Sequence, residues 1–175
     1  YTIKIDNEFR GLQFNNTGDK LKIIEIENWG VFDLSTGKVF KGCNNLNVTA
    51  SDAPIISSNN LGETFNSCGV LNGSIQSYNL WDMSGVSNIS QFARFTDFNS
   101  PINNWDVSNV TNMISAFANN PSFNQDLSSW DVSSVSSASN FLLGSSSFST
   151  ENYDKLLIGW EATMQSKFPN GSGYS

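Results

Sequence analysis

Three aspartates recur with the same neighbours and are the first candidates for chemistry. Asp82, Asp106 and Asp131 each follow a tryptophan, and these tryptophans are 24 and 25 residues apart. If the chain stacks at this period, the carboxylates form a row about 5 Å apart, the spacing of neighbouring strands, where like charges raise each other's pKa. We expect each Asp to accept backbone N–H groups in an Asx turn. A calcium ion between neighbouring coils is the alternative, although the dense Asp-x-Asp run that supplies six or more oxygens is absent.

Two cysteines are separated by the same period. Cys43 and Cys68 are 25 residues apart, so stacking would bring their backbones to about 5 Å, within the range of a disulfide. We favour two buried thiols that act as small apolar fillers, and a Cys43–Cys68 disulfide is the alternative. A zinc site is excluded because the chain has no His and no second Cys pair.

The sequence offers few residues that could form a catalytic site. Without His the usual general base is absent, and no Ser or Cys nucleophile has an evident partner. Asp126 and Asp131 could in principle form the carboxylate pair of a polysaccharide-active enzyme, but nothing distinguishes them from the turn residues of a repeat. We therefore expect a protein that is not an enzyme, with no catalytic residues, no cofactor and no metal.

Composition narrows the choice of partners. The net charge is -7, and the nine basic residues do not cluster, which argues against nucleic acid. No run of 18 apolar residues occurs, so membrane insertion is not expected. The chain opens on an alternating strand, residues 1–6, and we interpret the start as a cut through a larger protein whose flanking domains are partners.

The elements that would position these residues follow from the repeat. The run from Trp105 to Met113 recurs around Trp81 and Trp130, and Phe98, Phe123 and Phe148 are each 25 residues apart. Large apolar residues at a fixed period of this length are typical of a solenoid. Within a coil, the apolar spacing before and at each Trp predicts a short strand, and the spacing of three to four residues that follows predicts a short helix.

We therefore predict an α/β repeat solenoid, leucine-rich-repeat-like, of about five coils of short strand plus short helix, with an N-terminal β cap and a C-terminal helical cap. The predicted repeat core consists of Phe40, Phe65, Trp81, Phe92, Phe98, Trp105, Val107, Val110, Met113, Phe117, Phe123, Leu127, Trp130 and Val132.

The chain is expected to divide into four parts. Residues 1–20 would be the end of a preceding β module and the N-terminal cap, and residues 21–148 the solenoid. Residues 149–168 carry helical apolar spacing after the potential cap residues Ser149 and Thr150, which predicts the C-terminal capping helix. Residues 169–175 are rich in Gly and Ser and are expected to be a flexible tail.

Several of these motifs resemble the BspA-like leucine-rich-repeat surface proteins, over roughly residues 15 to 165. The resemblance is carried by Phe40-Lys41-Gly42-Cys43-Asn44-Asn45-Leu46, the Trp-Asp-Val-Ser-Asn-Val-Thr-Asn-Met run from Trp105, Phe123-Asn124-Gln125-Asp126-Leu127, and Asn152-Tyr153-Asp154-Lys155-Leu156-Leu157. It implies extracellular display on a cell or virion surface and adhesion, and it supplies no catalytic residues. The coil at 61–65 and the coil after Trp130 depart from the family pattern, which puts their regularity in doubt.

Two functions are expected from these observations. The first is a secreted or surface-displayed adhesion module that binds a protein or glycan on a cell surface or matrix. The second is a structural spacer or virion component, such as a phage tail, fibre or capsid-associated part. Solvent-facing residues discriminate them, because mutations on an adhesin surface abolish binding and mutations on a spacer are tolerated.

Overall fold

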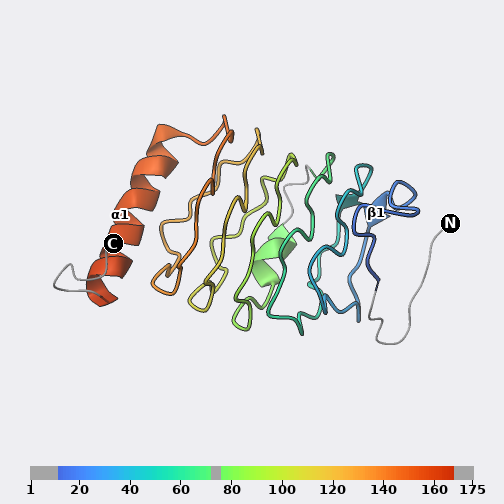
Figure 1. The fold of residues 1–175 in the computed structure, drawn as a ribbon, viewed down its shortest axis with the longest axis horizontal. Coiled ribbons are helices and arrows are strands. Elements are labelled where there is room, and N and C mark those ends of the chain that lie inside the picture. Colours follow the sequence, from blue (N-terminus) through green and yellow to red (C-terminus); the bar gives the residue numbers. More distant parts are fainter. Residues whose placement is uncertain (1–11, 72–75, 168–175) are drawn as a thin grey trace.

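The computed structural model describes residues 12–71 and 76–167, in which segments about one period apart lie side by side along the molecule (Figure 1). The elements in order are β1 (Glu25–Ile26), β2 (Asn47–Val48), the 3-10 helix η1 (Gln76–Leu80) and the α-helix α1 (Thr150–Lys167). Strands β1 and β2 pair in parallel, with Glu25 opposite Asn47. Most of the stacking therefore depends on backbone outside regular strands.

Five turn segments, residues 36–42, 61–67, 89–95, 113–119 and 138–144, form one side of the stack. In the first four segments, alternate N–H groups donate to carbonyls of the neighbouring segment; Glu63 bonds to Ser90 at 2.8 Å and Phe65 to Phe92 at 2.9 Å. The intervening N–H groups close short i to i+3 turns within the segment, as Thr64 does with Leu61. The backbone donors are thus divided between the segment itself and its neighbour.

Each turn segment contains two residues in the left-handed conformation, four positions apart. The first set is Lys38, Glu63, Gln91, Ser115 and Asn140, and the second is Gly42, Ser67, Phe95, Asn119 and Gly144. A continuous α-helix requires right-handed dihedral angles at every residue. These positions therefore interrupt any helix after less than two turns.

The predicted α/β leucine-rich-repeat-like solenoid of about five strand-plus-helix coils, with a β cap and a helical cap, is wrong. Within residues 12–71 and 76–167 the structure has two strands of two residues each, one 3-10 helix and one α-helix. The segments expected to be helices are the turn segments. Because these segments are built from i to i+3 turns, side chains three to four residues apart point into the interior. Their apolar spacing therefore resembles that of a helix. The expected strand at Trp105 is a turn in which its N–H bonds to Ile102 at 3.1 Å.

Aromatic rings form the interior of the stack. Phe40 and Phe65 stack with centroids 5.6 Å apart, and Trp105 and Trp130 with centroids 6.1 Å apart, so residues one period apart in sequence are in contact. Burying such side chains removes large apolar areas from water. Much of the free energy of folding therefore comes from contacts between neighbouring segments.

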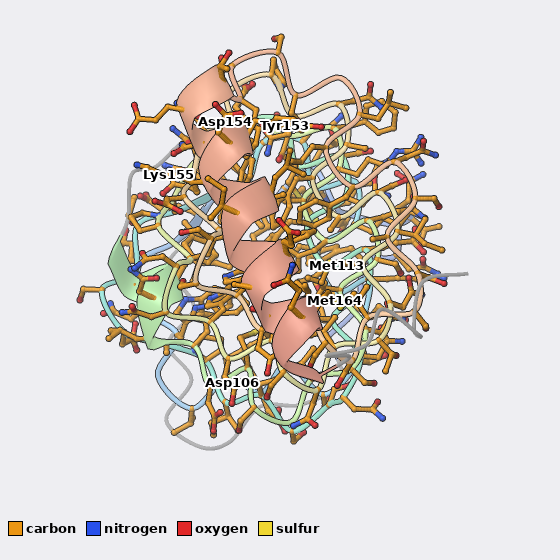
Figure 2. The ribbon with its side chains drawn as sticks, turned by 90° about the vertical axis from the view of Figure 1, so that its left-hand side faces the viewer. Asp106, Met113, Tyr153, Asp154, Lys155 and Met164 are labelled. Atoms are coloured by element: carbon orange, nitrogen blue, oxygen red, sulfur yellow. The ribbon has the colours of Figure 1, made fainter. Side chains whose placement is uncertain are left out.

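Helix α1 lies against the last segments of the stack (Figures 1 and 2). The Ser149 hydroxyl caps the helix by accepting from the Asn152 N–H at 3.2 Å. Leu156 is buried, and the Trp160 ring lies 5.5 Å from that of Phe141. Three other large side chains of α1, Tyr153, Leu157 and Ile158, are exposed.

The division of the chain into 1–20, 21–148, 149–168 and 169–175 remains a prediction. The strand expected over residues 1–6 and the tail expected over 169–175 lie outside the described residues. Within the described ranges, no helix combines the length and apolarity needed to cross a bilayer.

Candidate functional site

A polar groove runs across the first three turn segments and the chain just before them. Its volume is about 500 Å³, within the range of small-ligand sites. The lining residues are Gln13, Asn15, Thr36, Gly37, Lys38, Asn60, Gly62, Glu63, Asn88 and Ser90. None of these ten residues has an apolar side chain larger than a methyl group. The groove is therefore suited to a polar ligand.

The groove exists because one equivalent position of the turn segments carries small residues. Backbone hydrogen bonds between neighbouring segments define which residues are equivalent. The N–H of Lys38 bonds to the Gly62 carbonyl, that of Glu63 to Ser90, and that of Gln91 to Ile114. The equivalent position is therefore occupied in turn by Gly37, Gly62, Ser90 and Ile114. A Cβ atom on Gly37 would lie 2.5 Å from the Gly62 carbonyl oxygen, so position 37 has no room for a side chain. Ile114 is not among the lining residues.

Two neighbouring asparagines, Asn60 and Asn88, contribute amide groups to the lining. The Asn60 Oδ1 accepts from the Gly62 N–H at 2.8 Å, and the Asn88 Oδ1 accepts from the Ser90 N–H at 2.9 Å. These Asx turns fix both side chains through their oxygens. Each amide also carries two N–H donors, which these turns do not use.

The lining also includes two charged residues, Lys38 and Glu63. Glu63 lies between two lysines, with its Oε1 3.4 Å from the Lys38 Nζ and its Oε2 bonded to the Lys41 Nζ. Burial alone would raise the pKa of Glu63, but its hydrogen bond and attraction to Lys41, with a further contribution from Lys38, lower it below the ordinary value. Two ammonium groups share one carboxylate, so the cluster of Lys38, Lys41 and Glu63 has a net positive charge in a chain of net charge -7. Lys41 itself is not among the lining residues.

The groove offers mainly hydrogen-bond donors. Its lining supplies amide, hydroxyl and ammonium groups. A ligand rich in hydrogen-bond acceptors matches this set of groups.

The structure places each of the three candidate aspartates in a turn in which the N–H two residues later donates to its carboxylate. The Ser84 N–H and hydroxyl both donate to Asp82 Oδ1, and Ser108 does the same for Asp106, with hydroxyl distances of 2.6 Å in each case. The Ser133 N–H donates to Asp131 Oδ1 at 2.9 Å. The bonds from Ser84 lower the pKa of Asp82. Asp106, labelled in Figure 2, is exposed.

This geometry is that of the expected Asx turn. Among the residues that the structure describes, no three His, Cys, Asp or Glu side chains gather as metal ligands would. The other carboxylate pair, Asp126 and Asp131, is engaged separately: Asp126 accepts from the Ser128 N–H at 3.0 Å and lies 3.6 Å from the Lys155 Nζ.

Cys43 and Cys68 are both buried and free, so the alternative of a disulfide is not realised. Cys68 instead donates its S–H to the Phe40 carbonyl at 3.0 Å. Burial raises the pKa of Cys43 to about 12 and the pKa of Cys68 well above its ordinary value. Both side chains are therefore neutral thiols that fill the interior.

The structure places every residue of the predicted repeat core in the interior. Phe40, Phe65, Trp81, Phe92, Phe98, Trp105, Val107, Val110, Met113, Phe117, Phe123, Leu127, Trp130 and Val132 are each at most 3% exposed. The three tryptophans Trp81, Trp105 and Trp130 are thus not available as an exposed strip for sugar rings.

Sequence reasoning missed the groove. Lys38 and Glu63 are 25 residues apart and were not recognised as a pair. An alignment on Phe40, Phe65 and Phe117 places Gly37, Gly62 and Ile114 at one position. Ser90 joins that position only through the backbone pairing of the segments, in which the Glu63 N–H bonds to the Ser90 carbonyl, and this pairing is not evident from spacing.

Comparisons with known proteins place the chain beside one family. The family model described as "Mycoplasma protein of unknown function, DUF285" matches residues 8–89 and again residues 59–174. The two matches overlap and together cover most of the chain. Comparison with curated proteins and with solved structures gave no match.

Proposed function

This chain belongs to the DUF285 family of Mycoplasma proteins of unknown function, and from that premise we propose that it is a non-enzymatic binding module of a surface-displayed protein. The module recognises a ligand on a cell surface or matrix, either a protein or a glycan. The polar groove lined by Lys38, Asn60, Glu63, Asn88 and Ser90 carries this proposal.

The finer relationship to the BspA-like surface proteins is part of the proposal. It is supported by the motifs beginning at Phe40, Trp105 and Phe123, and it supplies the extracellular setting and the role in adhesion. The proposal does not include a leucine-rich-repeat fold.

Rigid presentation supports a role in recognition. The floor of the groove is backbone held by hydrogen bonds between segments, such as Lys38 N–H to the Gly62 carbonyl at 2.9 Å. The Asx turns fix Asn60 and Asn88. Groups that are held in place before the ligand arrives lose less conformational entropy on binding.

A structural spacer or virion component is the second candidate. It is favoured by the continuity of the interior, in which Trp81, Trp105 and Trp130 stack with centroids 6.2 and 6.1 Å apart. Such a stack resists bending without requiring any ligand.

Binding to intact candidate cells and to a panel of glycans and matrix proteins tests the proposal. The labelled 175-residue chain is compared with Ser90→Ile, which fills the groove with the residue found at the equivalent position 114. Ser139→Ile is the matched control, because residue 139 occupies the same position outside the groove. We expect saturable binding that Ser90→Ile abolishes and Ser139→Ile retains.

Urea unfolding establishes that each variant is folded. A folded chain that binds nothing on any of these surfaces would contradict the binding module and favour the spacer.

A further inference from the structure

We propose that the groove binds a saccharide bearing a carboxylate, such as a sialic or uronic acid. The inference rests on the proposed binding function and names the ligand class of the same site. It is carried by the groups that line or adjoin the groove: two ammonium groups around one carboxylate, the side-chain amides of Asn60 and Asn88, and the Ser90 hydroxyl.

The charge selects an anion. Lys41 is bonded to Glu63 Oε2, whereas Lys38 lies 3.4 Å from Oε1 and its side chain is 46% exposed. The carboxylate of Glu63 is therefore mainly occupied by Lys41, and the ammonium of Lys38 can bind a second carboxylate from solution. Charge-assisted hydrogen bonds of this kind are stronger than bonds between neutral groups.

The remaining donors select a ligand with many oxygens. The side-chain oxygens of Asn60 and Asn88 are used by the Gly62 and Ser90 N–H groups, so these side chains offer N–H groups to a ligand. Ser90 adds a hydroxyl to the floor. Hydroxyl and carboxylate oxygens of a sugar accept bonds from such donors.

The groove offers fewer interactions to a peptide than to a saccharide. An extended peptide pairs with free backbone groups at a sheet edge or places apolar side chains in pockets. At the floor of the groove, the Lys38 N–H bonds to the Gly62 carbonyl at 2.9 Å, and the Glu63 N–H bonds to the Ser90 carbonyl at 2.8 Å. The lining residues form no apolar pocket. An acidic peptide would retain only its charge interactions, so the saccharide is favoured.

Titration of the full chain with matched ligand pairs tests the inference. The probes are 3′-sialyllactose with lactose, a hyaluronan tetrasaccharide with chitotetraose, and a hexaglutamate peptide. Lys38→Gln removes the charge, and Gln stands at the equivalent left-handed position 91, so this substitution suits the backbone. Lys22→Gln is the control, because Lys22 pairs with Asp19 away from the groove.

We expect at least one acidic saccharide to bind about tenfold more tightly than its neutral partner, the effect of one charge-assisted hydrogen bond. Lys38→Gln should remove that preference and Lys22→Gln should keep it, while Ser90→Ile should abolish binding to both members of the pair. Equal affinity for the neutral partner, or tighter binding of hexaglutamate, would overturn the inference.

The failure of the ligand class is distinguishable from the failure of the function. If none of these saccharides binds but the wider panel shows saturable binding, the carboxylate inference is overturned and the binding module stands. If neither experiment shows binding by the folded chain, both are overturned.

Discussion

The carbonyl oxygen of Tyr78 accepts two hydrogen bonds, one from the Trp81 backbone N–H at 3.2 Å and one from the indole of Trp105 at 2.6 Å. The Ile102 carbonyl likewise accepts from the Trp105 backbone and the Trp130 indole. The indole of Trp81 is buried without a partner in the described structure. Each later tryptophan is therefore tied to the segment before it, and Trp81 is not.

This difference predicts unequal costs for the same substitution. Trp105→Phe loses ring volume and one hydrogen bond, whereas Trp81→Phe loses ring volume alone, and both side chains are 3% exposed. We expect the free energy of unfolding to fall by about 1 kcal/mol more for Trp105→Phe, the net value of a typical hydrogen bond. Urea denaturation measures both variants, and equal losses would contradict the role of the indole bond.

The left-handed positions predict a second pair of effects. Asn140 is exposed and has φ of 59°, a conformation that Gly adopts freely and β-branched residues avoid. Asn140→Val should lower the free energy of unfolding by about 1–2 kcal/mol, and Asn140→Gly should leave it within a few tenths.

Asn44, which is exposed and has no positive φ, is the control for this series. Asn44→Val should change stability by less than about 0.5 kcal/mol. A loss at residue 44 as large as that at residue 140 would show that the left-handed backbone is not the cause.

Glu63 predicts a dependence of stability on pH. Its pKa in the folded chain lies below the ordinary value of 4.5, so its ion pairs stabilise the fold fully above that pH. This contribution is lost as the pH falls through the folded pKa. Glu63→Gln should therefore destabilise the chain at pH 7 and differ little from the unmodified chain near pH 2.

Urea midpoints at both pH values measure this effect. Glu27→Gln, a change at an exposed residue, should shift neither midpoint appreciably. A Glu63→Gln deficit that persisted unchanged in acid would mean that packing, and not charge, is responsible.

The buried thiols predict resistance to modification. The pKa of Cys43 is raised to about 12 by burial, so at pH 8 almost no reactive thiolate forms in the folded chain. Iodoacetamide should label neither Cys43 nor Cys68 until the chain unfolds, as mass spectrometry would show. Rapid labelling of the folded chain would contradict the burial, and a two-hydrogen mass difference on reduction would reveal a disulfide.

The spacing of apolar residues in the sequence was sufficient to predict many of the residues that are buried in the structure. Residues such as Phe40 and Phe65 are 25 apart and stack in the structure, because a chain that repeats its path brings equivalent residues together. Spacing did not distinguish a helix from a turn segment. Met113 and Phe117 are four residues apart and buried in a segment whose left-handed residues Ser115 and Asn119 prevent a helix.

The sequence by itself therefore determined the period, the apolar interior and the local Asx turns, since each depends on residue type at fixed spacing. The tertiary structure decided the backbone of the turn segments and the groove. Lys38 and Glu63 meet only because neighbouring segments are in register, and the groove is open only where Gly37 and Gly62 adjoin. Both depend on contacts between residues distant in the chain, which local patterns do not specify.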